Sequence, residues 1–191
     1  PESLRRLPER NGACAAASGY YFGNGTLCSE RPCGAPNDQC ADAVPLAYSP
    51  TVNVPFESRC ATTDGPAVVG CDTGAQPVGS DMWYEYIAPC EGTVRVSLCG
   101  STDFDSVLVV YGTGATCTCP VEGSGQVACG DDTCGVQGGP SQVLFEAEGG
   151  HCYLIRVAGW QGEKGNGVLA VSYDTPCSPP GPGACCLADG A

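Results

Sequence analysis

The chain has 191 residues, 16 of them cysteines, and its 8 basic and 21 acidic residues give a net charge of -13. An even cysteine count at this density is typical of exported disulfide scaffolds and rare in the reducing cytosol, which indicates an extracellular or cell-surface protein. The acidic balance argues against nucleic acid as a partner, and no apolar run approaches the about 20 residues that a membrane-spanning helix needs.

Residues 1–33 are expected to be the N-terminal part of a small cysteine-rich module. Pro1 is neither a start methionine nor the beginning of a signal peptide, so we interpret the chain as a mature piece. One short helix is expected between Pro8, which suits a first helical turn, and Gly19, which suits a C-terminal cap. This segment carries four bases and three acids, a net charge of +1, whereas the rest of the chain carries four bases and 18 acids, a net charge of -14.

Residues 34–175 consist of short runs in which apolar and polar residues alternate, separated by Gly-, Asp- and Pro-rich turns. Such runs predict half-buried strands, and we expect seven to nine of them, including 51–56, 82–88, 93–98, 106–111, 142–147, 152–158 and 168–173. No helix-period pattern occurs here, so the fold class is all-β, an antiparallel β-sandwich or jelly roll. Its core is expected to include Trp83, Tyr86, Val94, Val96, Val109, Leu144, Ile155 and Val171.

Six motifs in order along this middle region carry a resemblance to a known domain family. They are NDQC (37–40), ATTDG (61–65), SDMWY (80–84), FDSVL (104–108) followed by VYG (110–112), ACGDD (128–132), and CYLIRV (152–157) followed by Gly159. Together they resemble the bacterial pre-peptidase C-terminal-like β-sandwich domains of large secreted proteins. The resemblance implies a non-catalytic accessory domain, appended to secreted proteases or repeated along cell-surface proteins.

The two ends of the chain resemble two halves of a small cysteine-rich repeat of secreted bacterial multi-repeat proteins. A proline-rich linker at 176–183 leads to GACCL at 183–187, the beginning of such a repeat, while Cys14, YFGNGT at 21–26, Cys28 and Cys33 match the remainder. We interpret the chain as one period of a polymer, in which residues 176–191 complete residues 1–33 of a neighbouring unit. The alternative is two unrelated termini with a chance pair of adjacent cysteines.

All sixteen cysteines are expected to be oxidised. The spacing leaves their connectivity open, except that Cys185 and Cys186 should reach different partners because a bond between neighbours strains the peptide. Cys117 and Cys119 are interpreted as disulfide half-cystines and not as a metal or redox site. Six cysteines lie at the ends: Cys14, Cys28, Cys33, Cys177, Cys185 and Cys186. Ten lie in the middle region and are expected to pair among themselves: Cys40, Cys60, Cys71, Cys90, Cys99, Cys117, Cys119, Cys129, Cys134 and Cys152.

The inventory of catalytic residues is short. His151 is the single histidine, and its place beside Cys152 at the start of an expected strand favours a surface or packing role. No nucleophile elbow, Cys-x-x-Cys pair, phosphate-binding loop or zinc-protease motif occurs. We therefore expect no enzymatic activity and no required cofactor.

Four carboxylates form a candidate calcium site, because the family resemblance implies that their two loops come together: Asp103, Asp105, Asp131 and Asp132. Calcium prefers hard oxygen ligands in this number, and a bound ion would relieve their mutual repulsion. The alternative is that Asp105 and Asp131 cap loop amides while the other two face solvent.

Asn24 begins a glycosylation sequon in a glycine-rich turn and is a candidate acceptor. Four aromatic side chains could form a sugar-stacking or docking face, and the alternative is that they make the core of the small module and a loop plug: Tyr20, Tyr21, Phe22 and Trp160.

Two functional classes compete. The first is a structural subunit or repeat of an extracellular filament or cell-surface array that assembles head-to-tail with copies of itself. Its interface would be formed by Tyr20, Tyr21, Phe22, Cys185, Cys186 and Leu187. The second is a carbohydrate- or protein-binding accessory module of a secreted hydrolase, with a surface glycan as its candidate ligand.

Overall fold

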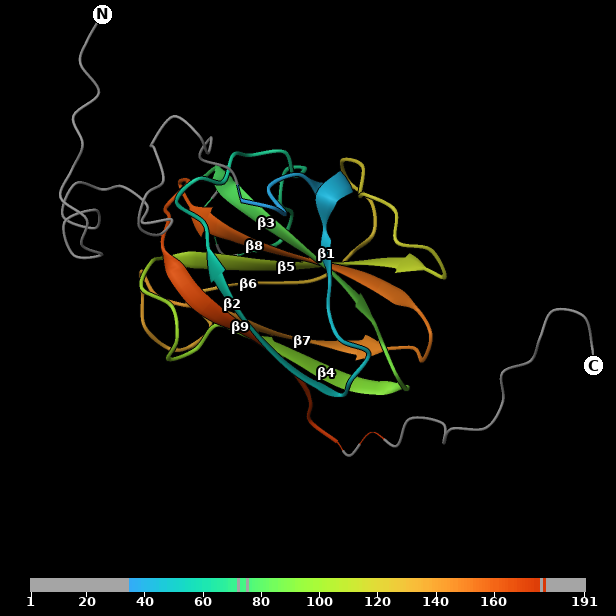
Figure 1. Cartoon of the computed structure of the whole chain (residues 1–191). Helices are drawn as coiled ribbons and strands as arrows, with labels where there is room; N and C mark the ends of the chain where they lie inside the picture. Colours follow the sequence, from blue (N-terminus) through green and yellow to red (C-terminus); the bar gives the residue numbers. More distant parts are fainter. Residues whose placement is uncertain (1–34, 72, 75, 176, 178–191) are drawn as a thin grey trace, which may run out of the picture. The chain divides into compact units, whose positions relative to one another are not determined.

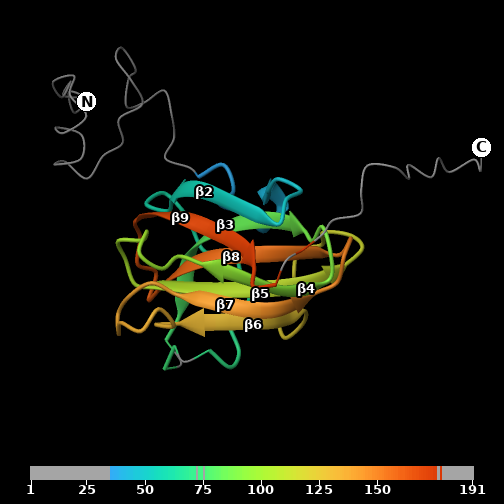
Figure 2. The same cartoon turned by 90° about the horizontal axis from the view of Figure 1, so that it is seen from below.

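The computed structural model describes residues 35–71, 73–74, 76–175 and 177, which form a two-layer β-sandwich (Figures 1 and 2). Sheet A contains, in spatial order, β1 (Val44–Pro45), β3 (Val78–Ile87), β8 (Cys152–Trp160), β5 (Ser106–Gly114) and β6 (Gln126–Asp131). Sheet B contains β2 (Thr51–Glu57), β9 (Asn166–Tyr173), β4 (Gly92–Ser97) and β7 (Gln142–Ala147). Neighbouring strands are antiparallel except β1 and β3, and the described residues include one short 3-10 helix, η1 (Cys40–Asp42).

This architecture confirms the expected all-β sandwich. Five of the seven runs singled out in the sequence lie within a strand, and the runs 82–88 and 93–98 extend one residue beyond β3 and β4. Two further strands were not singled out. β1 spans two residues, too few for a pattern, and β6 contains Gly130, which weakens the signal of alternating residues. The helix expected near Pro8 and Gly19 lies outside the described residues.

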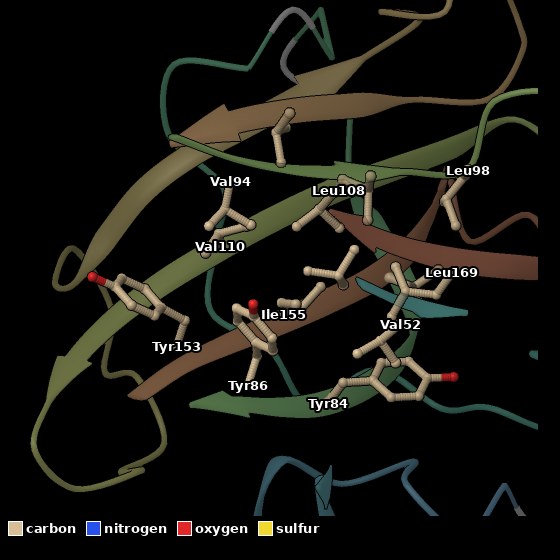
Figure 3. Packing of buried hydrophobic residues seen from close by; sticks show 14 of the residues in the cluster. Val52, Tyr84, Tyr86, Val94, Leu98, Leu108, Val110, Tyr153, Ile155 and Leu169 are labelled. Carbon is tan, nitrogen blue, oxygen red and sulfur yellow. The ribbon is translucent and has the colours of Figure 1, made fainter. Parts of the chain in front are cut away.

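The main core lies between the sheets, where inward-facing side chains of both layers meet (Figure 3). Val94 of β4, Ile155 of β8 and Val171 of β9 have no exposed surface, as the alternation predicts. The expectation for Leu144 is wrong, because its side chain is 48% exposed. Its neighbours Val143 and Phe145 are buried instead, since a strand has a period of two and Leu144 points to the outer face of β7.

A second core covers the outer face of sheet A. It joins Trp83 of β3, Val109 and Tyr111 of β5 and Leu154 of β8, all buried, with Val68 from the connection between β2 and β3 packed against them. The central strands are therefore buried on both faces, which explains why 106–111 and 152–158 read as nearly continuous apolar runs.

A buried ion pair fixes that connection to the sheet. Arg156 donates from Nε to Asp81 Oδ1 at 2.8 Å, and its Nη2 forms an ion pair with the same oxygen at 2.8 Å. The two side chains are 1% and 0% exposed. The guanidinium also donates to the Pro66 carbonyl at 2.7 Å and lies over the Trp83 ring, 5.7 Å from its centroid. The second carboxylate oxygen of Asp81 accepts the backbone N–H groups of Asp64 and Gly65, so the charge of each partner is fully engaged.

Five disulfides cross-link the sandwich: Cys40–Cys119, Cys71–Cys129, Cys90–Cys177, Cys99–Cys134 and Cys117–Cys152. Cys60 is disulfide-bonded as well. The interpretation of Cys117 and Cys119 as half-cystines is confirmed. The expectation that the ten middle cysteines pair only among themselves is wrong, because Cys90 bonds Cys177, which we had grouped with the ends. Cys177 follows the end of β9 by four residues, and the proline-rich sequence there gives no signal of this bond.

Within the described ranges no helix has the length and apolar character that crossing a membrane requires. The expectations for Tyr20, Tyr21, Phe22, Asn24 and Leu187, and for the cysteines at 14, 28, 33, 185 and 186, fall outside the described residues and stay predictions.

Candidate functional site

Three of the four acidic residues singled out in the sequence come together at one end of sheet A. Asp105 directly precedes β5, and Asp131 ends β6 opposite Val107 of β5. Asp132 follows with a positive φ of 57°, which turns the chain away from the sheet. Carboxylate oxygens of these three residues lie within 4.8 Å of one another.

The acidic cluster, defined as Asp105, Asp131 and Asp132, carries strong mutual repulsion. Burial, followed by the charges of Asp131, Asp132 and Glu163, raises the pKa of the Asp105 carboxyl from 3.8 to about 6. Asp105 Oδ1 is buried and has no hydrogen-bond partner among the described residues, while Asp132 Oδ1 accepts the Gly139 N–H at 2.9 Å. Because its carboxylates repel one another, the acidic cluster favours the binding of either a proton or a cation.

Asp103 stands apart from this cluster. Its carboxylate accepts the backbone N–H of Asn166 at 2.7 Å and the Asn166 side-chain amide at 2.9 Å, and Arg59 Nη2 lies 3.8 Å away. These bonds tie the connection between β4 and β5, which carries Asp103, to the start of β9. The alternative had Asp105 and Asp131 capping loop amides and the other two acids facing solvent. It is wrong for Asp103 and Asp132, because both accept backbone N–H groups.

The donor chemistry of the acidic cluster fits calcium. Carboxylate oxygens are the hard ligands that this ion prefers, and an ion there would satisfy the buried Asp105 oxygen and offset the repulsion that raises the Asp105 pKa. Calcium takes 6–8 oxygen ligands, so carbonyl groups or water would complete the shell.

The contacts of His151 and Trp160 indicate structural roles for both side chains. His151 is 41% exposed, and its Nδ1 lies 3.2 Å from Glu148 Oε2 at the tight turn before β8. Trp160 donates from its indole N–H to the Thr73 carbonyl at 3.1 Å and packs against the second core, as a loop plug does. Neither residue lies in the acidic cluster.

A cavity that the sequence did not reveal opens on the outer face of sheet A. Its volume is about 360 Å3, and it lies between the β2–β3 connection and the β5–β6 connection. Its lining comprises Pro66, Ala67, Val69, Tyr111, Gly123, Ser124, Gly125 and Gln126. The lining residues of these two connections are far apart in the sequence and belong to none of the six motifs, so only the fold brings them together.

Comparison with known proteins gives one family. No curated protein and no solved structure matches the chain. A family model described as galactose binding domain-like, with a T9SS-associated label, matches residues 36–169. The match covers β1 to the first half of β9 and supports the β-sandwich implied by the motifs, whereas the pre-peptidase resemblance and the cysteine-rich repeat stay expectations. Because the match spans well over half of the chain, the protein belongs to this galactose binding domain-like, T9SS-associated family.

Proposed function

We propose that this chain is a non-catalytic binding module of a secreted protein, which attaches a larger secreted or cell-surface polypeptide to carbohydrate. Family membership carries the proposal, because the family is described as galactose binding domain-like and is associated with a secretion system. The five disulfides of the described part support an oxidising, extracytosolic location.

The way the sandwich is built supports binding as its task. Disulfides tie long connections to the sheets, which keeps the loops in one conformation and lowers the entropy that a ligand must remove. The acidic surface suits neutral ligands better than anionic ones, since the net charge of -13 repels anions. These features favour an uncharged glycan over an acidic partner.

A glycan array probed with the fluorescently labelled chain tests this proposal. We expect retention on a subset of neutral glycans that is lost when the disulfides are reduced and the thiols alkylated. The matched control is an equally labelled disulfide-rich protein of similar charge. Retention of the chain on no glycan, at concentrations up to the millimolar range, would end the carbohydrate proposal.

Calcium is expected to stabilise the loops at the acidic cluster. In chelator at pH 7 the Asp105 carboxyl is ionised beside like charges, so Asp105→Asn should raise the melting temperature. In calcium the wild type should gain stability, and the variant should gain little, because the Asp105 oxygen no longer carries charge. Differential scanning calorimetry in chelator and in millimolar calcium measures both effects.

The pH dependence has a definite sign. The folded pKa of Asp105, about 6, exceeds its ordinary 3.8, so in chelator this group stabilises the fold at low pH and loses that contribution as pH rises through about 6.

The control for the calcium measurement is Asp103→Asn, since Asp103 lies outside the cluster and its variant should keep the full calcium response. Identical wild-type melts in chelator and in calcium would refute calcium binding.

Head-to-tail self-association is a second candidate, supported by the sequence. The first 33 residues carry a net charge of +1 and the remainder -14, which favours contact between the head of one unit and the body of the next. Sedimentation velocity of the intact chain at low and at physiological salt tests it. Growing oligomers at low salt support assembly, and a monomer at every concentration and salt rules it out.

A further inference from the structure

An open groove of about 340 Å3 lies where the chain leaves sheet B, and we call it the exit groove. One side is formed by the start of β2, and the other by the end of β9 and the residues that follow it. β2 and β9 are paired strands, so the two sides are neighbours in the sheet. The exit groove is lined by Pro50, Thr51, Tyr173, Asp174, Thr175 and Cys177.

A cluster of three tyrosines supports the exit groove. The Tyr173 hydroxyl donates to the Cys90 carbonyl at 2.5 Å, and the Tyr48 hydroxyl donates to the adjacent Pro89 carbonyl at 3.4 Å. The Tyr86 hydroxyl donates to the carbonyl of the residue after Tyr48. Burial, followed by interactions with Tyr173 and then Tyr48, raises the pKa of the Tyr86 phenol, so the three side chains lie together. Their hydroxyls are bound to the backbone, which fixes the positions of the rings.

The cluster also leaves aromatic surface open to solvent. Tyr48 is 61% exposed and precedes Pro50 of the exit groove by two residues. Tyr173, which lines the groove, is partly exposed. Grooves lined by aromatic rings and proline are the surfaces on which proteins bind proline-rich segments in the polyproline II conformation.

The chain brings a proline-rich sequence to this groove. The Cys90–Cys177 disulfide anchors Cys177 at the lining, and the next five residues in the sequence are SPPGP, at 178–182. A polyproline II strand rises about 3.1 Å per residue, so five residues span about 15 Å, which is enough to cross a groove of this volume. The anchor keeps the sequence beside the groove at an effective concentration on the order of millimolar, so weak contacts suffice to dock it.

The groove and the proline-rich sequence match in charge and in hydrogen-bonding groups. Residues 178–182 have no ionisable side chain, and the one carboxylate among the described lining residues, Asp174, is neutralised by Arg95. The guanidinium donates to both carboxylate oxygens, at 2.9 and 2.8 Å. A polyproline II backbone has no internal hydrogen bonds, so its carbonyls can accept from the Thr51 and Thr175 hydroxyls of the lining.

We propose that residues 178–182 dock in the exit groove of their own chain as a polyproline II strand, with Pro179 and Pro180 against the Tyr173 ring and Pro50. Proline has a fixed φ, so docking such a segment costs little conformational entropy. The docked segment gives the chain one direction as it leaves the sandwich toward GACCL at 183–187. Whatever follows is then held at a defined angle to the sandwich, a role that does not depend on glycan binding.

The test is NMR relaxation of the complete 191-residue chain, with the backbone order parameter of Gly181 as the readout. Gly181 lies four residues beyond the anchored Cys177, so a tethered but undocked segment should leave it below about 0.6, the flexible range. Docking should bring it close to about 0.85, the value of rigid backbone. Nuclear Overhauser contacts are expected between the ring protons of Pro179 or Pro180 and those of Tyr173.

Two variants disrupt the docking from opposite sides. Thr51→Glu fills the exit groove with a charged side chain, and the double variant Pro179→Gly/Pro180→Gly removes the polyproline II preference of the segment. Each should lower the Gly181 order parameter below about 0.6 while the amide shifts of β8 stay unchanged. The matched control is Asn53→Glu, an exposed position on the same face of β2 that does not line the groove, and it should keep the wild-type value.

Three results would overturn the proposal. They are a flexible Gly181 in the wild type, a rigid Gly181 in Thr51→Glu, and proline–Tyr173 contacts that arise only between differently labelled chains in a mixed sample. The last result would assign the groove to a second copy of the chain. If Thr51→Glu fails to fold, the double proline variant decides, because its substitutions lie outside the sandwich strands.

Discussion

Replacing Arg156 by methionine should lower the free energy of unfolding by about 3–5 kcal/mol, the usual cost of breaking a buried ion pair by removing one partner. The loss has a specific cause. Asp81 is 0% exposed, and without Arg156 its carboxylate would keep only the two N–H groups of Asp64 and Gly65. Since native domains are stable by about 5–15 kcal/mol, a loss of this size removes a large share of the total stability.

A double-mutant cycle with Asp81→Asn isolates the electrostatic part. The double variant should be more stable than Arg156→Met alone, because the uncompensated charge is gone. The control is Arg95→Met, which breaks a surface pair with Asp174 of equal length, 2.8 Å, whose side chains are 35% and 33% exposed. Urea unfolding should show a loss below about 1 kcal/mol for this control. Equal losses for Arg95→Met and Arg156→Met would contradict the account.

Reduction of the disulfides should unfold the sandwich at room temperature. In the loop-entropy model the Cys90–Cys177 bridge, with a sequence separation of 87, contributes about 4.6 kcal/mol, and Cys99–Cys134, with a separation of 35, about 3.8 kcal/mol. A few such losses exceed the stability of a typical domain. Far-ultraviolet circular dichroism with and without a phosphine reductant measures the change.

Paired serine substitutions, each removing one disulfide, measure how much that bridge contributes to the free energy of unfolding. Replacing both Cys90 and Cys177 should destabilise slightly more than replacing both Cys99 and Cys134, because the longer loop gains more entropy when released. Mild alkylation of unreduced protein serves as the control and should modify no cysteine of the five bridges. A cooperative melt that survives complete reduction would show that packing alone holds the fold.

The fold was largely predictable because strand alternation is a local signal. The run at 142–147 matches β7 at both ends, yet the side chain assigned to the core within it, Leu144, faces out. A period-two pattern defines two faces, and both faces of this run carry apolar residues, so only the partner strands decide which one is buried. The connection that covers the outer face of sheet A has no periodic pattern, so the sequence does not predict the second core.

The sequence predicts a candidate site only where its functional side chains are adjacent in the chain or belong to a recognised motif. Asp131 and Asp132 are adjacent and Asp105 follows from the resemblance, so three members of the acidic cluster were identified in advance. The resemblance also groups Asp103 with them, but the hydrogen bonds of Asp103 go to Asn166. The Tyr111 cavity had no signal, because its walls come from uncharged residues about 55 positions apart that carry no motif.

The central claim of the proposal is that the protein binds a glycan without cleaving it. The most direct measurement combines isothermal titration with an assay of newly formed reducing ends, using in one sample the neutral glycan retained best on the array. The account predicts saturable binding and no increase in reducing ends over many hours. Release of reducing ends at a rate proportional to protein concentration, or no binding by a correctly folded chain, would contradict it.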